Sequence, residues 1–280
     1  MKTDSMAKTV TVICSALVIA AVASGVHHIV SFAGYNYDDA DKYTVGDAVI
    51  TDSVKNLDID WTSGNINFEY HDEDTVEISE KSRKKLSEDK KMRWWFDDGN
   101  LRIRFAKKGI SFFSWGFDQN KELTVKLPEG ISLEDVNIDS TSGDVNIPSL
   151  QAQMLTLDVV SGDIRLNLSG AGELKMSSVS GNVEATLDIV SSAEIDTTSG
   201  DVKLSAPGLE KLDIDVTTGD VTAALSGKPG FTAHLDTVTG KINYDLPLIK
   251  ESGAYVCGDG SGNVKIDTTT GDINLISAAE

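Results

Sequence analysis

The chain contains few cysteine and histidine residues, and their scarcity excludes several kinds of chemistry. Its 280 residues include two cysteines, Cys14 and Cys257. Cys14 lies in an apolar stretch that should sit in lipid or be removed, so the two thiols cannot pair and the fold must be stable without a disulfide. Outside that stretch the only histidines are His71 and His234, too few for a Ser, His and acid grouping or a Cys and His grouping. We therefore expect a protein that is not an enzyme.

Positive charge is also scarce. The 25 Lys and Arg residues are outnumbered by 44 Asp and Glu residues, which gives a net charge of −19. This balance argues against nucleic-acid binding, because a phosphate backbone is held by clustered positive charge. Metal cations and cationic partners fit the charge better. Within the regular part of the sequence Arg165 is the only arginine, so a polysaccharide lyase, with Asp-bound calcium and an Arg or Lys base, is a less favoured hypothesis.

An apolar run near the N-terminus indicates that the rest of the chain is exported. Residues 9–32 contain no Asp, Glu, Lys or Arg, with lysines before them and aspartates after them. A run of roughly 20 residues can just span a hydrocarbon layer of ~30 Å. The positive-inside rule then places residues 1–8 in the cytoplasm. We expect a single-pass signal anchor in the cell membrane, with the C-terminal domain outside the cytoplasm.

Two further expectations concern this N-terminal region. The sequence Ala21-Val22-Ala23 has the pattern of a cleavage site, so a removable signal peptide is the alternative to an anchor. Residues 33–55 carry several acids and little periodicity, which predicts a linker between the membrane and the domain.

A short phrase, Ser or Thr followed by Gly and then usually Asp or Asn, recurs eight times between alternating apolar residues. Its glycines are Gly64, Gly143, Gly162, Gly181, Gly200, Gly219, Gly240 and Gly271. The intervals from Gly143 to Gly219 are 19 residues each, and the next is 21. A constant period of this size predicts stacked copies of one small structural unit.

Each phrase joins two segments of strict apolar alternation. Leu155, Leu157 and Val159 lead to one turn, and the alternation resumes at Ile164. Alternation is typical of strands with one buried face, and a second bend closes each circuit. Two strands and two bends in 19–22 residues is the length of one β-solenoid coil, in which each strand pairs with its equivalent one coil along. We predict an all-β, single-domain β-solenoid over residues 56–278.

An antiparallel meander of hairpins is the alternative fold, since Gly-Asp and Gly-Asn also form tight hairpin turns. Hairpins vary independently in length, so a meander does not require a constant period. The period is interrupted twice. Between Gly240 and Gly271 we expect one enlarged circuit containing residues 247–262, and between Gly64 and Gly143 lies an insertion at residues 71–126.

Acidic residues recur at two fixed positions of the repeat, four residues before the turn glycine and one residue after it. Both positions point outward, so stacking predicts two columns of carboxylates along one edge, spaced ~4.8 Å apart. One hypothesis is a set of weak calcium sites; otherwise no cofactor is expected. The alternative is structural, because Asp and Asn suit turns and bond to backbone. The candidate ligands are Asp139, Asp144, Asp158, Asp163, Asp196, Asp201, Asp215 and Asp220.

The insertion at 71–126 has a different composition from the repeats. Seven of the 25 basic residues fall between Lys81 and Arg93, and eight of the 18 aromatic residues fall between Trp94 and Phe117. Such a segment could bind anionic lipid headgroups, a wall polymer or a partner protein. Alternatively it forms the cap that the open end of a solenoid requires. The candidate partner-binding residues are Lys84, Lys85, Arg93, Trp94, Trp95 and Trp115.

The repeated Thr-Ser-Gly-Asp phrase, together with the segment 258–266 that leads into Thr270-Gly271-Asp272-Ile273, resembles the bacterial putative-adhesin family of β-strand repeat proteins. The resemblance covers about residues 50–278. It implies a membrane-anchored β-solenoid, supplies no catalytic residues, and suggests a role in cell-envelope surveillance, because some relatives are encoded with envelope-stress regulators. We expect an adhesin-like module that binds envelope components or partner proteins, with a calcium-binding surface module as the alternative.

Overall fold

The computed structural model describes residues 35–109, 121–170 and 172–278. The predicted membrane segment, 9–32, and the candidate Trp115 lie outside these residues. In the described ranges no helix is long and apolar enough to cross a membrane. The helices found there are two short 3-10 segments, η1 (Ala40–Lys42) and η2 (Glu88–Lys90). Strands make up most of the remainder, which confirms the all-β prediction.

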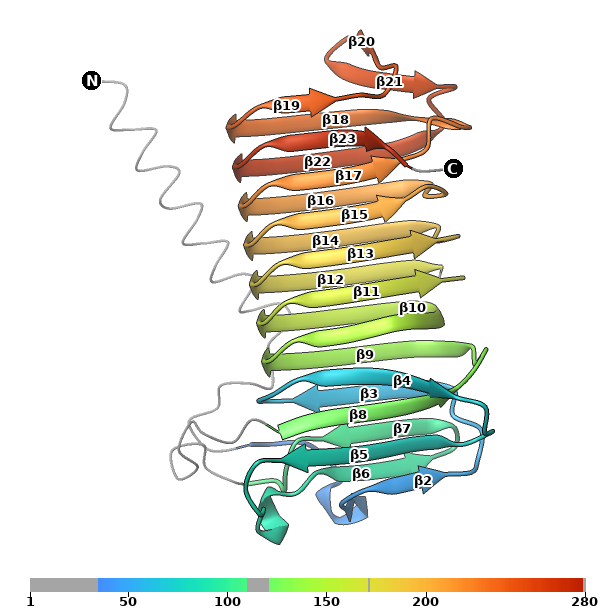
Figure 1. Cartoon of the computed structure of the whole chain (residues 1–280), viewed down its shortest axis with the longest axis vertical. Coiled ribbons are helices and arrows are strands. Elements are labelled where there is room, and N and C mark those ends of the chain that lie inside the picture. Colours follow the sequence, from blue (N-terminus) through green and yellow to red (C-terminus); the bar gives the residue numbers. More distant parts are fainter. Residues whose placement is uncertain (1–34, 110–120, 171, 279–280) are drawn as a thin grey trace, which may run out of the picture.

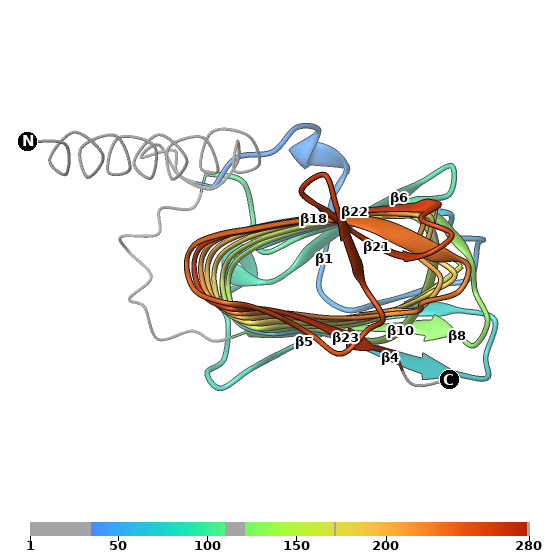
Figure 2. The ribbon, with the colours of Figure 1, turned by 90° about the horizontal axis from the view of Figure 1, so that it is seen from above.

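The strands stack as the two long sides of a flattened coil (Figures 1 and 2). One side, which we name sheet A, consists in spatial order of β7 (Asn100–Arg104), β3 (Asn56–Trp61), β9 (Leu133–Ser142), the second part of β10 (Val145–Ser161), β12 (Glu173–Ser180), β14 (Ser192–Ser199), β16 (Lys211–Thr218), β22 (Gly262–Thr270) and β18 (Gly230–Thr239). The other side, sheet B, consists of β8 (Lys121–Pro128), β4 (Ile66–His71), the first part of β10, β11 (Ile164–Ser169), β13 (Val183–Asp188), β15 (Val202–Ala206), β17 (Val221–Leu225), β23 (Ile273–Ser277) and β19 (Ile242–Tyr244).

Equivalent residues of successive coils are in register and point into one interior. Leu155 of β10 lies opposite Leu174 of β12, and Leu157 lies opposite Met176. All four side chains are at most 1% exposed. Side chains alternate between the faces of a strand, so the period-2 pattern directs one complete set inward. Neighbouring strands within these two sheets are parallel, which excludes the meander and confirms the solenoid.

The coils do not stack in chain order at the C-terminal end. The coil β22–β23 lies between β16–β17 and β18–β19. The enlarged circuit expected at 247–262 is present, because Thr239 pairs with Thr270, 31 residues further along the chain, but its place in the stack was not predicted. Residues 247–262 leave the end of the stack in the strands β20 (Ile249–Glu251) and β21 (Ala254–Gly258), with β21 antiparallel to β18, and the chain then returns to an inner position. Hydrogen bonding on both edges of β22 makes that position favourable.

The same inversion occurs at the N-terminal end. The coil β3–β4 lies between β7–β8 and β9–β10. The insertion at 71–126 therefore contains the strands of a further coil, β7 and most of β8, together with two antiparallel strands that cover the end, β5 (Val76–Ser82) and β6 (Arg93–Asp97). Phe105, which follows β7, is fully buried. Most of the described part of the insertion thus belongs to the body of the solenoid and its cap.

The interval predicted as a linker, 33–55, is folded from its first described residue onward. Tyr35 and Tyr37 are buried, and β1 (Thr44–Val45) and β2 (Ala48–Ile50) extend the cap by pairing with β6 and β5. The Tyr35 hydroxyl accepts a hydrogen bond from the Phe105 backbone N–H at 3.0 Å and donates one to the Asp60 carbonyl at 3.2 Å. The linker prediction is wrong for the described residues because irregularly spaced tyrosines fix this segment, and such contacts leave no periodic signal.

Candidate functional site

The turn that carries the repeated phrase requires glycine for a steric reason. Gly181 has φ 137°, and a Cβ atom placed on it would lie 2.0 Å from the carbonyl oxygen of Gly162 in the previous coil. Gly200 and Gly219 show the same approach to the glycine stacked beneath them. A contact of this length is impossible for a real Cβ, so only glycine allows the coils to stack closely at this edge.

The residues after these glycines form a ladder of hydrogen bonds between coils. The Asp144 Oδ1 atom accepts the Asp163 backbone N–H at 2.9 Å, and the Asp163 Oδ1 atom accepts that of Asn182 at 2.9 Å. Asn182 accepts from Asp201 at 3.0 Å, and Asp201 accepts from Asp220 at 2.9 Å. An amide at Asn182 performs the same role as its acidic neighbours. The turn column, as we name residues 144, 163, 182, 201 and 220, therefore stabilises the stack through its side-chain oxygens.

The acidic residues four positions before the turn glycines form a second column, on the outer face of sheet A. The turn column lies at the turns instead, so the prediction that both columns share one edge is wrong. We name the second column the face column; in spatial order it is Asp60, Asp139, Asp158, Ser177, Asp196, Asp215, Asp267 and Asp236. Burial, then the neighbouring Asp158, Asp60 and Asp58, raise the pKa of Asp139 to about 7. Burial and nearby carboxylates raise the pKa of Asp196 to about 6. Burial and, after it, neighbouring carboxylates thus oppose the ionisation of Asp139 and Asp196 in the face column.

The predicted calcium ligands do not gather into a compact cluster. In the described residues, the one group of three or more His, Cys, Asp or Glu side chains whose ligand atoms lie within 4.8 Å of one another is His71, Glu73 and Glu77, on the cap. Lys126 lies 3.7 Å from Glu77 in that group. The calcium hypothesis for the Asp columns remains a prediction.

A polar pocket of about 270 Å³ lies where the cap meets the face column. We name it the junction pocket; it is lined by Tyr37, Asp38, Asp39, Tyr43, Asp58, Asp60, Trp95, Arg102, Arg104, Asn137 and Asp139. Arg104 binds Asp58 through two nitrogens, at 3.0 and 2.6 Å, so this carboxylate is neutralised. Nη1 of Arg102 is buried and has no hydrogen-bond partner. The pocket therefore combines a donor without a partner, several carboxylates and aromatic walls, a composition suited to a polar ligand.

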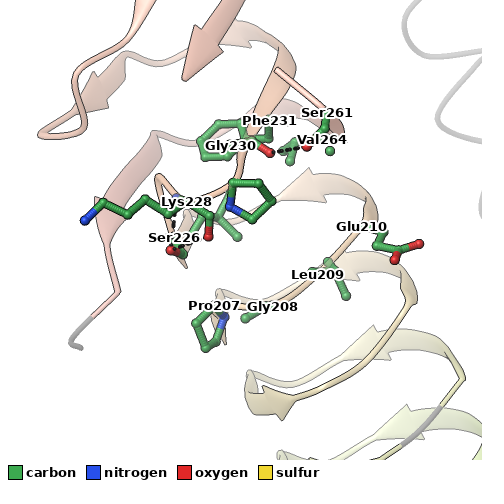
Figure 3. Close-up of a pocket in the computed structure, with 14 residues that line it drawn as sticks. Pro207, Gly208, Leu209, Glu210, Ser226, Lys228, Gly230, Phe231, Ser261 and Val264 are labelled. Carbon is green, nitrogen blue, oxygen red and sulfur yellow. Dashed lines mark hydrogen bonds between the residues drawn. The ribbon is translucent and has the colours of Figure 1, made fainter. Parts of the chain in front are cut away.

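A second pocket, of about 390 Å³, lies near the C-terminal end, at the edge of the coil opposite the turn glycines (Figure 3). The connection between β17 and β18 must pass over β22 to reach its place in sheet A. The pocket opens between this connection and the bend that precedes β16, beside Leu225, Phe231 and Val264. It is a consequence of the inverted coil order.

The predicted partner-binding residues are divided between the surface and the packing of the cap. Lys84 and Lys85 are exposed on the segment between β5 and β6, and Arg93 donates a hydrogen bond to the Glu88 carbonyl at 3.1 Å. Trp94 packs against the core. Trp95 lines the junction pocket, but Lys42 and Arg102 each lie 4.5 Å from its ring centroid. Cations therefore already occupy the surface of the Trp95 ring.

One buried cation was not predicted. The Lys121 side chain is completely buried, 2.6 Å from Glu80, and donates hydrogen bonds to the carbonyls of Lys90, at 2.8 Å, and Phe105. Burial lowers the pKa of Lys121 to about 8, against the opposing effect of Glu80. The sequence did contain a signal, since Lys121 has the same parity as the inward-pointing Leu123 and Val125. The backbone of Lys121 stacks on Gly64, where the next coil would have its turn glycine.

Comparison with solved structures finds chains of low sequence identity. A putative cell adhesion protein from Clostridium sporogenes has 15% identity and a TM-score of 0.41, over 84% of this chain and 100% of that one. A putative adhesin from Bacteroides fragilis has 16% identity and a TM-score of 0.45, over 84% of this chain and 97% of that one. No curated protein matches this sequence.

Comparison with protein families gives a match over most of the chain. The family model described as Toastrack DUF4097 matches residues 54–276, well over half of the chain. The matched range starts just before β3 and ends within β23, so it contains both inverted ends of the solenoid. The chain therefore belongs to the Toastrack DUF4097 family.

Proposed function

We propose that this protein is a non-enzymatic, adhesin-like binding module, anchored in the cell membrane by residues 9–32 and displayed outside the cytoplasm, where it binds an envelope component or partner protein. The observation that carries the proposal is the junction pocket. It lies on a stack of paired strands and gathers arginine, carboxylate and aromatic groups where the cap meets the face column. Solenoids commonly present such sites on extended rigid surfaces.

Chemistry at the pocket favours a ligand with both hydrogen-bond acceptors and a positive group. The unpartnered Nη1 atom of Arg102 can donate to an acceptor. Asp60 and Asp139, which are paired in register, both line the pocket, and a cationic group there would favour the ionised form of Asp139 against the burial and the neighbouring carboxylates that raise its pKa. An amine-bearing polymer or a basic protein segment has both features.

A pull-down from envelope extracts tests this function. The bait is the full chain, compared with the variant Asp139→Asn, which removes one pocket carboxylate with little change of shape. Asp236→Asn is the matched control, because Asp236 occupies the opposite end of the face column. We expect Asp139→Asn alone to lose the bound component. Equal recovery by all three proteins would refute a role for the pocket.

The second candidate function is calcium binding by the face column, favoured because burial and, after it, neighbouring carboxylates raise the pKa of Asp139 and Asp196. A bound divalent cation would relieve this repulsion. Thermal melts with and without millimolar calcium test it, with magnesium as the control ion. An unchanged melting temperature in calcium would remove this candidate.

A further inference from the structure

We propose that the exposed basic segment of the cap, residues 81–91, docks on anionic lipid headgroups of the membrane in which the chain is anchored, so that the solenoid stands with its N-terminal end on the bilayer. The inference rests on the membrane attachment in the proposed function. It assigns a partner to a surface that the junction pocket does not include.

Positive charge is concentrated in the segment 81–91 of the cap. The segment 81–91 contains six basic residues, against the acids Glu88 and Asp89, in a chain of net charge −19. Those that are exposed are Lys81, Arg83, Lys84, Lys85 and Lys91. The face of sheet A carries the acidic face column instead, and an anionic surface would repel it. An anionic bilayer therefore attracts the segment 81–91 and repels the face column.

The basic segment has a fixed place at the end of the stack. It connects β5 to β6, and η2 within it lies at the end opposite β20 and β21 (Figure 1). The Lys107 backbone N–H donates to the Asp89 carbonyl at 3.1 Å, and the Lys107 ammonium lies 2.9 Å from the Asp89 carboxylate. The buried Lys121 holds the Lys90 carbonyl from below at 2.8 Å. The segment is thus an ordered surface, which loses little conformational entropy on docking.

The chain enters the described domain beside this segment. The Tyr35 carbonyl accepts the Gly109 backbone N–H at 2.7 Å, and Gly109 is two residues from Lys107, the partner of Asp89. The apolar run ends at residue 32, three residues before Tyr35. Three residues extend by at most about 10 Å, which is close to the Debye length of about 8 Å at physiological salt. Attachment through residues 9–32 therefore brings the basic segment within electrostatic reach of the headgroups.

Hydrogen exchange on the full chain tests the proposal. The chain is reconstituted in nanodiscs of phosphatidylcholine with or without phosphatidylglycerol, and backbone exchange is followed in residues 81–91 and, as an internal control, in residues 226–230. We expect phosphatidylglycerol to slow exchange in 81–91 several-fold and leave 226–230 unchanged. High salt should abolish the difference, because the attraction is screened.

Charge-reversal variants supply the matched comparison. Arg83→Glu, Lys85→Glu and Lys91→Glu are combined in one protein, and the exposed residues Lys211, Lys228 and Lys241 of the body are changed to Glu in another. Each basic residue near an anionic surface changes the docked population about fivefold. Only the first variant should therefore lose the effect of phosphatidylglycerol. Circular dichroism checks that both variants remain folded.

The outcomes separate this inference from the proposed function. Equal exchange in the two kinds of nanodisc, with the chain retained through an alkaline wash, overturns docking and leaves the anchor intact. A chain that the wash removes refutes the anchor itself. If exchange in 81–91 slows only after envelope extract is added, the partner is a protein or polymer. That result would overturn the lipid assignment.

Discussion

At the scale of single residues, the turn glycines are determined by stacking more than by local backbone conformation. Gly181 has a positive φ, as many turn residues do, but its defining feature is the carbonyl oxygen of Gly162 where a Cβ would lie. Gly170 also has a positive φ, 66°, yet nothing lies within 4 Å of its Cβ position. This pair allows backbone strain and steric contact to be measured separately.

We expect Gly181→Ala to destabilise the protein more than Gly170→Ala. The strain of a positive φ costs about 1 kcal/mol in either variant. Gly181→Ala must in addition separate two coils, so its total loss should reach about 3 kcal/mol or more. Chemical denaturation of the two variants provides the measurement. Equal losses would show that the coils accommodate the methyl group.

The buried pair of Lys121 and Glu80 should depend strongly on both partners. Lys121→Met keeps most of the volume but leaves the Glu80 carboxylate buried without its cation, so we expect a loss of about 3–5 kcal/mol. Glu80→Gln added to Lys121→Met should restore part of that stability, because the uncompensated charge is removed. A double-mutant cycle by urea denaturation gives the coupling. Additive effects would mean that the 2.6 Å contact contributes little.

At the scale of the elements, the coil order distinguishes this solenoid from a simple stack. In a stack that followed the chain, β22–β23 would be terminal and β18–β19 internal. The structure reverses this order, and Ile266 of β22 is completely buried while Ile242 of β19 is only partly buried. Antiparallel strands then cover both sheets at the N-terminal end and the edge of sheet A at the C-terminal end, where they protect open strand edges.

Alanine substitutions can test the inverted order. Ile266→Ala should cost about 2–5 kcal/mol, the usual range for a fully buried isoleucine. Ile242→Ala should cost about 1 kcal/mol, because less apolar area is buried there. Thermal or urea denaturation compares the two proteins. A larger effect at Ile242 would indicate that the coils stack in chain order.

At the scale of the whole molecule, the face column should make stability depend on pH in an unusual direction. The pKa of Asp139 is about 7 and that of Asp196 about 6 in the folded protein, above the value of about 4 in an unfolded chain. The folded state thus binds more protons between these values, so its stability falls as pH rises from about 4 to 7. Many proteins behave oppositely at the acidic end of this range.

We therefore expect a higher melting temperature at about pH 5 than at about pH 8. Asp139→Asn should stabilise the protein at the higher pH by about 1 kcal/mol, allowing for the partial exposure of this side chain, and should reduce the pH dependence. Asp188→Asn, an exposed carboxylate on sheet B, is the control. A melting temperature that rises steadily with pH would contradict the expectation.

The local pattern was sufficient to predict the coil but not the cap. Alternation at Leu155, Leu157 and Val159 and a constant 19-residue period specify strand, turn and burial in each coil, because these depend on residues close in the chain. The junction pocket depends on residues brought together from 37–60, 95–104 and 137–139. The repeat predicts that Asp60 and Asp139 meet, since each lies four residues before a turn glycine, but nothing in the spacing indicates that 37–43 and 95–104 join them.

The sequence by itself determined the all-β class, the repeating unit and the inward face of each strand in the regular coils, because a period-2 pattern between fixed turns allows one register. Tertiary structure alone decided the order of the coils at both ends, the folding of 35–55 onto the cap and the pairing of Lys121 with Glu80. Those features depend on which strand edges remain open and on contacts between residues far apart in the chain. Any coil of the same length can form the hydrogen bonds between parallel strands. The position of a coil in the stack therefore depends on which strands cover the two ends.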